Sequence, residues 1–314
     1  MKRELKKLSA VVPAYNEQEV LPLFCERMDA VLKTMGCAYE IILVDDGSRD
    51  ATWQVIQEES KKNSHIRGLR FARNFGHQLA VTAGMDAADG DALVVIDADL
   101  QDPPEVIPEM VEKWREGYDV VYGKRKKREG ETFLKKFTAF LYYRLLKAMS
   151  GTAIPLDTGD FRLLDRKVAD VMGGMREHNR FLRGLSAWTG FSQCPVEYVR
   201  HERAAGKTKY TLKKMLKLAA DGIIGYSAKP LTMAFFLGGG ALGLTALCMI
   251  ALLVFQILHG FALFPWVIAL LFLLCGANLV FLGVIGAYIA RIYDEAKNRP
   301  LYIISERTGH SGQA

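Results

Sequence analysis

Apolar residues follow two different patterns along this chain. Up to about residue 228, short apolar runs alternate with longer stretches of helical character. This alternation favours an α/β fold, in which a mostly parallel sheet is flanked by helices. The expected strands are Leu8–Val12, Glu40–Val44, Ile66–Phe71, Ala92–Ile96 and Asp119–Tyr122, and the expected helices are Glu17–Met35, Thr52–Asn63, His77–Ala88 and Pro104–Glu116.

The second pattern is a continuous apolar stretch. Pro230–Ala290 spans 61 residues without a single Asp, Glu, Lys or Arg. Since a helix crosses the hydrocarbon core of a bilayer with about 20 residues, two spans fit. The turn formers around Gly260 separate helices expected at Thr232–Leu258 and Pro265–Ala290, packed as a transmembrane hairpin. The alternative is a pair of helices buried in a large soluble core.

Positive charge flanks this stretch on both sides, and the loop between the two helices has none. By the positive-inside rule, both termini and the N-terminal domain are cytoplasmic. No cleaved targeting segment is expected, because the basic N-terminus leads only into a short strand. The chain thus divides into a cytoplasmic domain (1–228), a membrane hairpin (229–292) and a cytoplasmic C-terminal tail (293–314). The flanking cations are Lys207, Lys209, Lys213, Lys214, Lys217 and Lys229 before the hairpin and Arg291, Lys297, Arg299 and Arg307 after it.

Two amphipathic segments suit helices that lie in the membrane interface. They span about 132–149 and 211–227, and each sets an apolar stripe beside Lys or Arg side chains. Ordinary packing against the sheet is the alternative. An interfacial position would let a lipid stay in the membrane while its headgroup enters a cytoplasmic site.

Composition and charge agree with a hybrid molecule that has a soluble part and a membrane part. Hydrophobic residues make up 50% of the chain and charged residues 24%. The net charge of +6 is modest, and anionic lipid headgroups explain a basic face better than nucleic acid does. The five cysteines are an odd number without paired spacing, so free thiols in a reducing compartment are expected.

Acidic residues follow the second and fourth expected strands. Residues two apart in an extended segment point to the same side, so Asp97 and Asp99 can present both carboxylates to one divalent cation. Each acidic group has a simpler explanation as a helix cap, through Asp102 before two prolines or through Ser48 or Asp50. Together, at one edge of the sheet, they favour a nucleotide-sugar site.

Four motifs of the sequence resemble those of family 2 glycosyltransferases. A fifth motif, Thr158–Leu163, together with the two expected membrane spans, is similar to the polyprenyl-phosphate glycosyltransferases, a group with bactoprenol glucosyltransferases, dolichol-phosphate mannose synthases and a transferase for formylated aminoarabinose. The resemblance implies a GT-A nucleotide-diphospho-sugar transferase domain and transfer with inversion. The four motifs are Val11–Glu17, Val44–Ser48, Arg73–Gly76 and Asp97–Pro104.

The resemblance also implies roles for particular residues. Asp160 stands where the family's proposed base lies, although a structural acid paired with Arg162 is the alternative. Because the second pKa of a phosphate monoester is about 6, Asp160 has more to do in orienting the acceptor than in removing a proton. The implied sets are Asp160 and Asp97 for catalysis, Pro13, Tyr15, Asn16, Glu17, Asp45, Asp46, Asp97, Ala98, Asp99 and Gln101 for the donor, Asp99 for Mg²⁺ or Mn²⁺, and Arg125, Arg203 and Lys209 for the acceptor phosphate.

The implied function is metal-dependent transfer of a sugar from a nucleotide sugar to a polyprenyl phosphate at the cytoplasmic face of a bacterial inner or plasma membrane. Glucose from UDP-glucose and undecaprenyl phosphate are the preferred donor and acceptor. GDP-mannose or a UDP-aminosugar as donor, a processive polysaccharide synthase and a non-catalytic membrane subunit are the alternatives. A homo-oligomer is expected, and the family suggests a tetramer.

Overall fold

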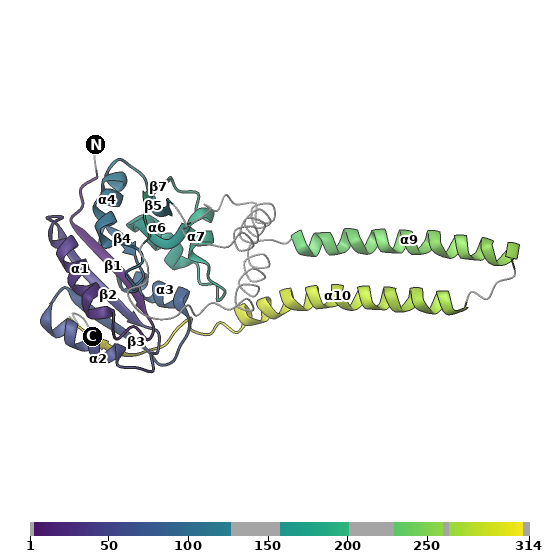
Figure 1. The fold of residues 1–314 in the computed structure, drawn as a ribbon, viewed down its shortest axis with the longest axis horizontal. Coiled ribbons are helices and arrows are strands. Elements are labelled where there is room, and N and C mark those ends of the chain that lie inside the picture. Colours follow the sequence, from purple (N-terminus) through teal and green to yellow (C-terminus); the bar gives the residue numbers. More distant parts are fainter. Residues whose placement is uncertain (1–2, 127–157, 201–228, 260–263, 310–314) are drawn as a thin grey trace. The chain divides into compact units, whose positions relative to one another are not determined.

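The computed structural model describes residues 3–126, 158–200, 229–259 and 264–309. The expected interfacial helices, Arg203 and Lys209 lie outside these ranges. Contacts between residues divide the chain into two compact units. One is an α/β unit that includes the segment after residue 299, and the other contains two long apolar helices, α9 (Lys229–His259) and α10 (Phe264–Ala296) (Figure 1).

The α/β unit is built on one mixed sheet. Its eight strands lie in the order β7-β5-β6-β4-β1-β2-β3-β8. The pairings set β6 and β8 antiparallel to their neighbours, and the other strands run in a common direction. The strands are β1 Lys7–Ala14, β2 Ala38–Asp45, β3 Ile66–Phe71, β4 Ala92–Val95, β5 Val120–Arg125, β6 Thr158–Asp165, β7 Gln193–Tyr198 and β8 Ile304–Thr308.

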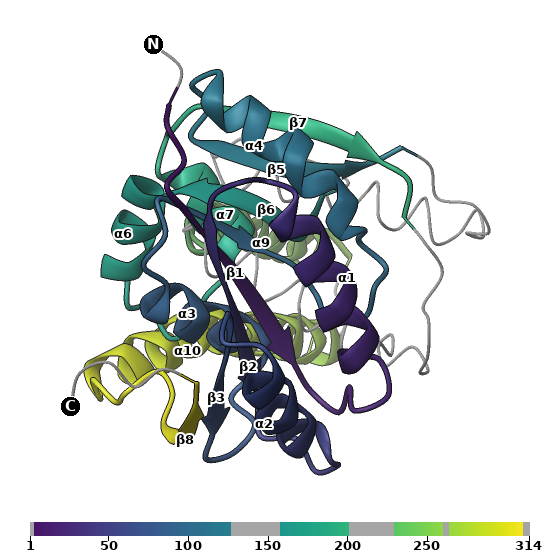
Figure 2. The same cartoon turned by 90° about the vertical axis from the view of Figure 1, so that its left-hand side faces the viewer.

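Helices cover both faces of this sheet (Figure 2). Buried residues of α1 (Leu21–Lys33), α2 (Thr52–Lys62) and α4 (Ile107–Arg115) form one core, and those of α3 (His77–Ala87), α6 (Arg166–Gly174) and α7 (Leu182–Trp188) form the other. Strand residues alternate between the two: Ile41 and Leu43 join the first core, and Ile42 and Val44 join the second. Burial on both faces explains why the strands read as continuous apolar runs.

The expected strands and helices of the first half are present with shifted ends. The first helix begins at Leu21 rather than Glu17, with proline in its first turn. The Glu17 amide instead donates a hydrogen bond to Thr52 Oγ1 over 2.9 Å. A short 3₁₀ turn, Pro104–Val106, precedes α4 where a single helix was expected.

The C-terminal segment contains a strand that the sequence did not predict. This segment was expected to be a tail from residue 293, but α10 continues to Ala296 and β8 pairs antiparallel with β3. The strand reads Ile-Ser-Glu-Arg-Thr, with one apolar residue. Such a sequence has no apolar alternation from which a strand can be recognised.

Strand register determines which residues meet at the carboxyl edge. Ala14 at the end of β1 pairs with Asp45 at the end of β2. In the antiparallel pair β4–β6, Val95 is opposite Arg162. Asp97 follows the end of β4 by two residues, and Asp160 precedes Arg162 on β6 by two residues, so both lie at this edge of the sheet.

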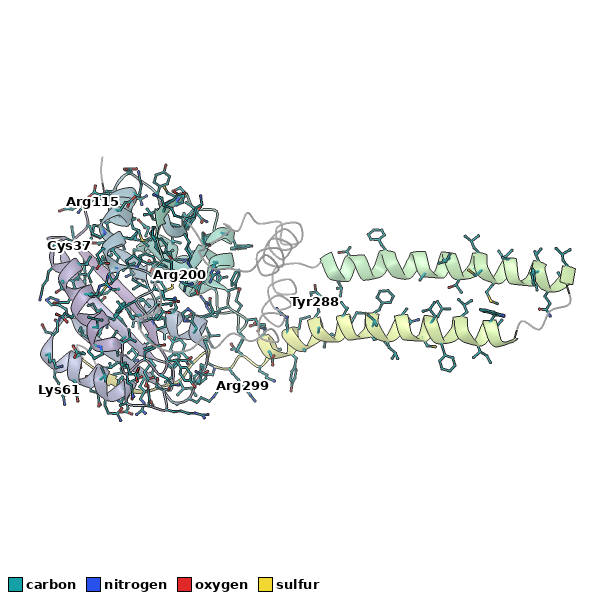
Figure 3. The ribbon with its side chains drawn as sticks, in the orientation of Figure 1. Cys37, Lys61, Arg115, Arg200, Tyr288 and Arg299 are labelled. Carbon is teal, nitrogen blue, oxygen red and sulfur yellow. The ribbon has the colours of Figure 1, made fainter. Side chains whose placement is uncertain are left out.

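The second unit is an antiparallel pair of apolar helices, α9 (Lys229–His259) and α10 (Phe264–Ala296). Gly238–Leu258 and Trp266–Ala296 are long and apolar enough to cross a membrane, with mean hydropathies of 2.4 and 2.6 and 0% of either window buried. The side chains drawn along them are mostly carbon (Figure 3). Such exposure does not fit core helices of a soluble protein.

The five cysteines of the chain are free thiols in the structure, as the sequence predicted.

Candidate active site

The loop after β1 is fixed to the loop after β2. Asn16 adopts a left-handed backbone conformation, with φ of 55°. Its amide donates to Ser48 Oγ over 2.9 Å, and its Oδ1 accepts from the Arg49 amide over 2.9 Å. These bonds place the Pro13–Glu17 motif beside Asp45. Asn16, expected to bind the donor, therefore also joins the two loops.

One carboxylate oxygen of Asp45 is in position to accept a hydrogen bond from a ligand. Its Oδ1 accepts from the Ser48 amide over 2.9 Å. Its Oδ2 is buried and has no hydrogen-bond partner among the described residues. The nearest cation is Arg70, whose Nε lies 3.5 Å away. Burial raises the pKa of Asp45, and Ser48 and Arg70 oppose the shift. An N–H or O–H of a ligand can satisfy this oxygen.

Asp46 holds the loop that leads into α3. Its carboxylate accepts from the backbone amides of Phe75 and Gly76, at 2.7 and 3.0 Å, and from Asn74 Nδ2 at 2.9 Å. The same loop passes closely over Gly47, where a Cβ would lie 2.4 Å from the carbonyl carbon of Arg73. Asp46 was expected to bind the nucleotide sugar. In the structure, its oxygens accept hydrogen bonds from the N–H groups of Asn74, Phe75 and Gly76.

His77 joins the two carboxylates expected to be catalytic. It is the first residue of α3. Its Nε2 lies 3.1 Å from Asp160 Oδ2 and 3.7 Å from Asp97 Oδ1. Although burial opposes its protonation, Asp97 and Asp160 raise the pKa of His77 to about 9. Protonated His77 therefore separates two like charges that the sheet register brings together.

Asp160 is a buried ion-pair partner, with 8% of the residue exposed. It accepts from Arg183 Nε at 2.7 Å and from Gln78 Nε2 at 3.0 Å, in addition to His77. Burial acts to raise the pKa of Asp160, but the charges of Arg183 and His77 hold it well below its ordinary value. The carboxylate therefore stays ionised at neutral pH.

Arg162 was the ion-pair partner that the sequence suggested for Asp160 as a structural acid, but its hydrogen bonds go elsewhere. Its guanidinium donates to the backbone carbonyls of Gly159 and Asp160, at 3.1 and 3.3 Å, and to Ser186 Oγ at 2.5 Å. The cation that pairs with the Asp160 carboxylate from α7 is Arg183, at 2.7 Å. Arg162 hydrogen-bonds to the backbone, and its charge adds to those of Arg183 and His77 in lowering the pKa of Asp160, whereas the carboxylate's ion-pair partner Arg183 lies 23 residues further along the chain.

Asp97 and Asp99 fit a divalent cation. Asp97 Oδ1 is buried and has no hydrogen-bond partner in the described part of the chain. Burial, with repulsion from Asp160 and Asp99, raises the pKa of Asp97 to about 6 against the charge of His77. Asp99 Oδ1 accepts from the Gln101 amide over 3.1 Å, and Leu100 between them has φ of 57°. This turn brings the two carboxylates to one short segment, with Ala98 buried.

No group of three or more His, Cys, Asp or Glu suited to a metal is found among the described residues. That does not argue against Mg²⁺, which commonly binds one or two carboxylates together with waters and substrate phosphates. The two carboxylates of Asp97 and Asp99 therefore suit a cation that takes its remaining ligands from waters and a diphosphate.

Asp102 organises two arginines near the same loop. It is buried, accepts from the Tyr198 hydroxyl and lies 3.9 Å from Arg125 and 3.8 Å from Arg200. Arg200 also donates to Gln101 Oε1 over 2.6 Å. The cap that the sequence suggested for Asp102 is not formed, because the N-cap residue is Pro103. Tertiary contacts, rather than the local helix, hold this carboxylate.

Gly159 gives Arg125 its place. A Cβ on Gly159 would lie 2.8 Å from an Arg125 guanidinium nitrogen. A side chain at this position would therefore displace Arg125.

The helix caps that the sequence suggested for α2 are only partly present. Asp50 Oδ1 accepts a hydrogen bond from the Thr52 amide over 3.1 Å, but the N-cap residue itself is Ala51. Ser48 is used instead to orient Asp45.

Comparisons with known proteins identify the family of this chain. The model of glycosyl transferase family 2 matches residues 9–173. The chain is 52% identical over 303 residues to the uncharacterized glycosyltransferase YkcC of Bacillus subtilis, covering 96% of this chain and 94% of the relative. It is 38% identical over 302 residues to the SfII prophage-derived bactoprenol glucosyl transferase of Shigella flexneri, covering 96% and 98%.

Among solved structures, the chain is similar to glucosyl-3-phosphoglycerate synthase of Mycobacterium tuberculosis in complex with Mn²⁺, UDP and glucosyl-3-phosphoglycerate. That similarity has a TM-score of 0.47 and 20% identity over 70% of this chain and 78% of the other. The fold has the mixed sheet and flanking helices of the GT-A type. Because the family model covers more than half of the chain and the relatives match nearly all of it, the chain belongs to glycosyl transferase family 2 and is a glycosyltransferase.

Proposed function

We propose that this enzyme transfers glucose from UDP-glucose to the phosphate of undecaprenyl phosphate, at the cytoplasmic face of the membrane and with inversion. The observation that carries the proposal is the similarity to a protein named bactoprenol glucosyl transferase, which covers 96% of this chain and 98% of that relative. A match of this extent takes in the two apolar helices as well as the catalytic domain.

The reaction is a single displacement at the anomeric carbon. An oxygen of the acceptor phosphate forms a bond to C1 of the sugar while the bond from C1 to the donor diphosphate breaks, and UDP leaves with the electron pair. Since the second pKa of a phosphate monoester is about 6, the attacking oxygen is already largely ionised at neutral pH. The step therefore requires no general base.

This chemistry gives Asp160 an orienting role. Its two oxygens are occupied by Arg183, Gln78 and His77, and its low pKa makes it a weak proton acceptor. A fixed carboxylate of this kind holds His77 and Arg183 in place, and pre-oriented charges are an effective way to stabilise a transition state. Asp97, which His77 also contacts, lies where the sugar and diphosphate are expected.

Donor binding uses the edge formed by the first two strands. Asp45 Oδ2 would accept a hydrogen bond from the nucleoside, beside Pro13, Tyr15 and Glu17. Asp99, with Asp97 nearby, would hold Mg²⁺ or Mn²⁺, whose charge would offset that of the diphosphate. Gln101 would lie against the donor.

Acceptor binding needs cations, since the acceptor and donor both bring phosphates. Arg125, held by Asp102 and Tyr198, would contact the acceptor phosphate together with Arg203 and Lys209. Replacing Arg203 and Lys209 by Ala should raise the Michaelis constant for the lipid. The charge pattern around α9 and α10 supports a membrane hairpin with both termini in the cytoplasm, and the glycines of the hairpin support a homo-oligomer.

The test is a transfer assay with the full-length protein in detergent. Undecaprenyl phosphate, Mg²⁺ or Mn²⁺ and one of several radiolabelled donors are mixed, and label is counted in the organic phase. Label from UDP-glucose that is lost in Asp99→Ala, but kept in the exposed control Asp170→Ala, supports the proposal.

Other outcomes identify the alternatives. Label from GDP-mannose or UDP-N-acetylglucosamine alone would change the sugar but keep the reaction. Label in a long polymer would indicate a processive synthase. If nucleotide binds and no lipid is labelled from any donor, the proposal is wrong.

A further inference from the structure

The strand β8 lies beside β3 at one edge of the sheet (Figure 2). It pairs with β3, and Thr308 Oγ1 lies 2.7 Å from Ser60 Oγ of α2. Just before the strand, the Tyr302 hydroxyl donates to Asp86 over 2.7 Å, and its ring stacks on Phe71. Residues 302–308 are therefore held to the rest of this unit by several contacts.

Glu306 makes the most specific of these attachments. Its Oε2 accepts from the indole N–H of Trp53 over 2.9 Å, and its Oε1 accepts from Arg70 Nη1 over 2.5 Å. Trp53 is buried, and the Arg70 guanidinium lies 5.9 Å from the centre of its ring. The antiparallel register sets Arg70 directly opposite Glu306. Glu306 thus fixes the position of the Arg70 guanidinium.

Arg70 also faces the donor site on its other side. The register of β2 and β3 pairs it with Asp45, so that Asp45, Arg70 and Glu306 form one row across three strands. Arg70 Nε lies 3.5 Å from Asp45 Oδ2. That separation is too long for a good hydrogen bond, but the charge still acts over it.

We propose that Glu306 and Arg70 are positioning residues for the donor nucleotide. Glu306 holds Arg70 where its charge favours ionised Asp45 while Oδ2 of Asp45 stays open to a nucleoside N–H or O–H. Once Glu306 is removed, the guanidinium loses its second carboxylate, closes on Asp45 and occupies that oxygen. The inference rests on the proposed role of Asp45 in the donor site.

A simpler role for β8 would be to cover the edge of β3, as edge strands often need. The two roles differ in what they require of Glu306. Covering an edge depends on backbone pairing, and a half-exposed ion pair adds little to stability. Positioning depends on the Glu306 carboxylate itself.

The experiment measures binding of UDP and GDP to the full-length protein in detergent with Mg²⁺, by calorimetry. Glu306→Gln should raise the dissociation constant of the bound nucleotide about tenfold, the ratio that corresponds to one weakened charge-assisted hydrogen bond. Thr308→Val is the matched control, since it removes a side-chain attachment of the same strand without touching Arg70. It should bind nucleotide as the wild type does.

Kinetics with UDP-glucose give a second readout. Glu306→Gln should raise the Michaelis constant for the donor and leave that for the lipid unchanged. Nucleotide binding equal to wild type in Glu306→Gln, or an equal loss in both variants, overturns the positioning role. If the wild type binds neither nucleotide, the proposed function itself fails, and the inference with it.

Discussion

Replacing Asp160 by Asn tests the centre of the proposed mechanism. The substitution keeps the shape of the side chain and removes its charge. Asp160 is 8% exposed and receives hydrogen bonds from Arg183 and His77. The change therefore leaves two cations without their shared carboxylate, while Asp97 remains in contact with His77.

The structure sets the size of the expected effects. Removing one partner of a fully buried ion pair costs about 3–5 kcal/mol. Because the side chains of Arg183 and His77 are 27% and 42% exposed, the expected loss is smaller, on the order of 2 kcal/mol. For the reaction, a displaced catalytic group lowers the rate about 100-fold. The donor's Michaelis constant should stay near wild type, since Asp45 and its neighbours are unchanged.

The assay combines steady-state kinetics with the pH dependence of the rate. In the wild type, His77 with a pKa of about 9 is protonated at neutral pH. Asp160→Asn removes one of the two carboxylates that raise this pKa, so the pKa should fall. Turnover of the variant should therefore decline with rising pH over a range where the wild type is constant. Near-normal turnover, or an unchanged pH profile, would refute the reasoning.

A companion variant tells whether Asp160 acts through His77. If it does, His77→Gln should lower the turnover number to a similar extent. The double variant should then be little worse than either single one, since residues that act as a unit are not additive. Fully multiplicative losses would show that the two side chains act independently.

Three further variants test other parts of the structure. Gly47→Ala should lower the free energy of unfolding by about 2 kcal/mol or more, because φ is +66° and a Cβ would lie 2.4 Å from Arg73; a denaturant titration measures this. Asp46→Ala should lower turnover more than donor affinity, since it frees the loop before His77, and kinetics with varied donor separate the two. Contacts with Lys167 and Arg3 outweigh burial and lower the pKa of Asp119 to about 2, so its stabilising contribution is present above its ordinary value of 3.8 and is lost as pH falls through about 2. Unfolding midpoints at decreasing pH should accordingly fall less steeply in Asp119→Asn than in the wild type.

Local patterns predicted the first half of the fold well. The strand Ile66–Phe71 was expected with the bounds that the structure shows. Apolar runs bounded by turn residues are a strong signal when a strand is buried on both faces, as β2 is. The position of Asp45 and Asp97 at the carboxyl edge of the sheet could be predicted for the same reason, because both directly follow such runs.

Residues whose role depends on distant partners could not be predicted in this way. His77 is the first residue of an expected helix, and nothing beside it in sequence indicates two carboxylates within 4 Å. Asp102 resembles a helix cap locally, but Tyr198 and two arginines determine its position. Glu306 lies in a strand with almost no apolar pattern. In each case the partner comes from a remote part of the chain.

The proximity of Asp97 and Asp160, which both lie within 4 Å of His77, ultimately depends on apolar residues of the sheet. β6 runs antiparallel between β4 and β5, and its register is set where Leu93 meets Leu164 and Val94 meets Leu163. These four residues are buried, with Val94 and Leu163 in one core and Leu93 and Leu164 in the other. A slip of one residue would turn every side chain of β6 to the opposite face and move the Asp160 carboxylate away from His77. Packing of both cores therefore selects the register that brings the two carboxylates together, and the charge of His77 offsets the repulsion that this register creates.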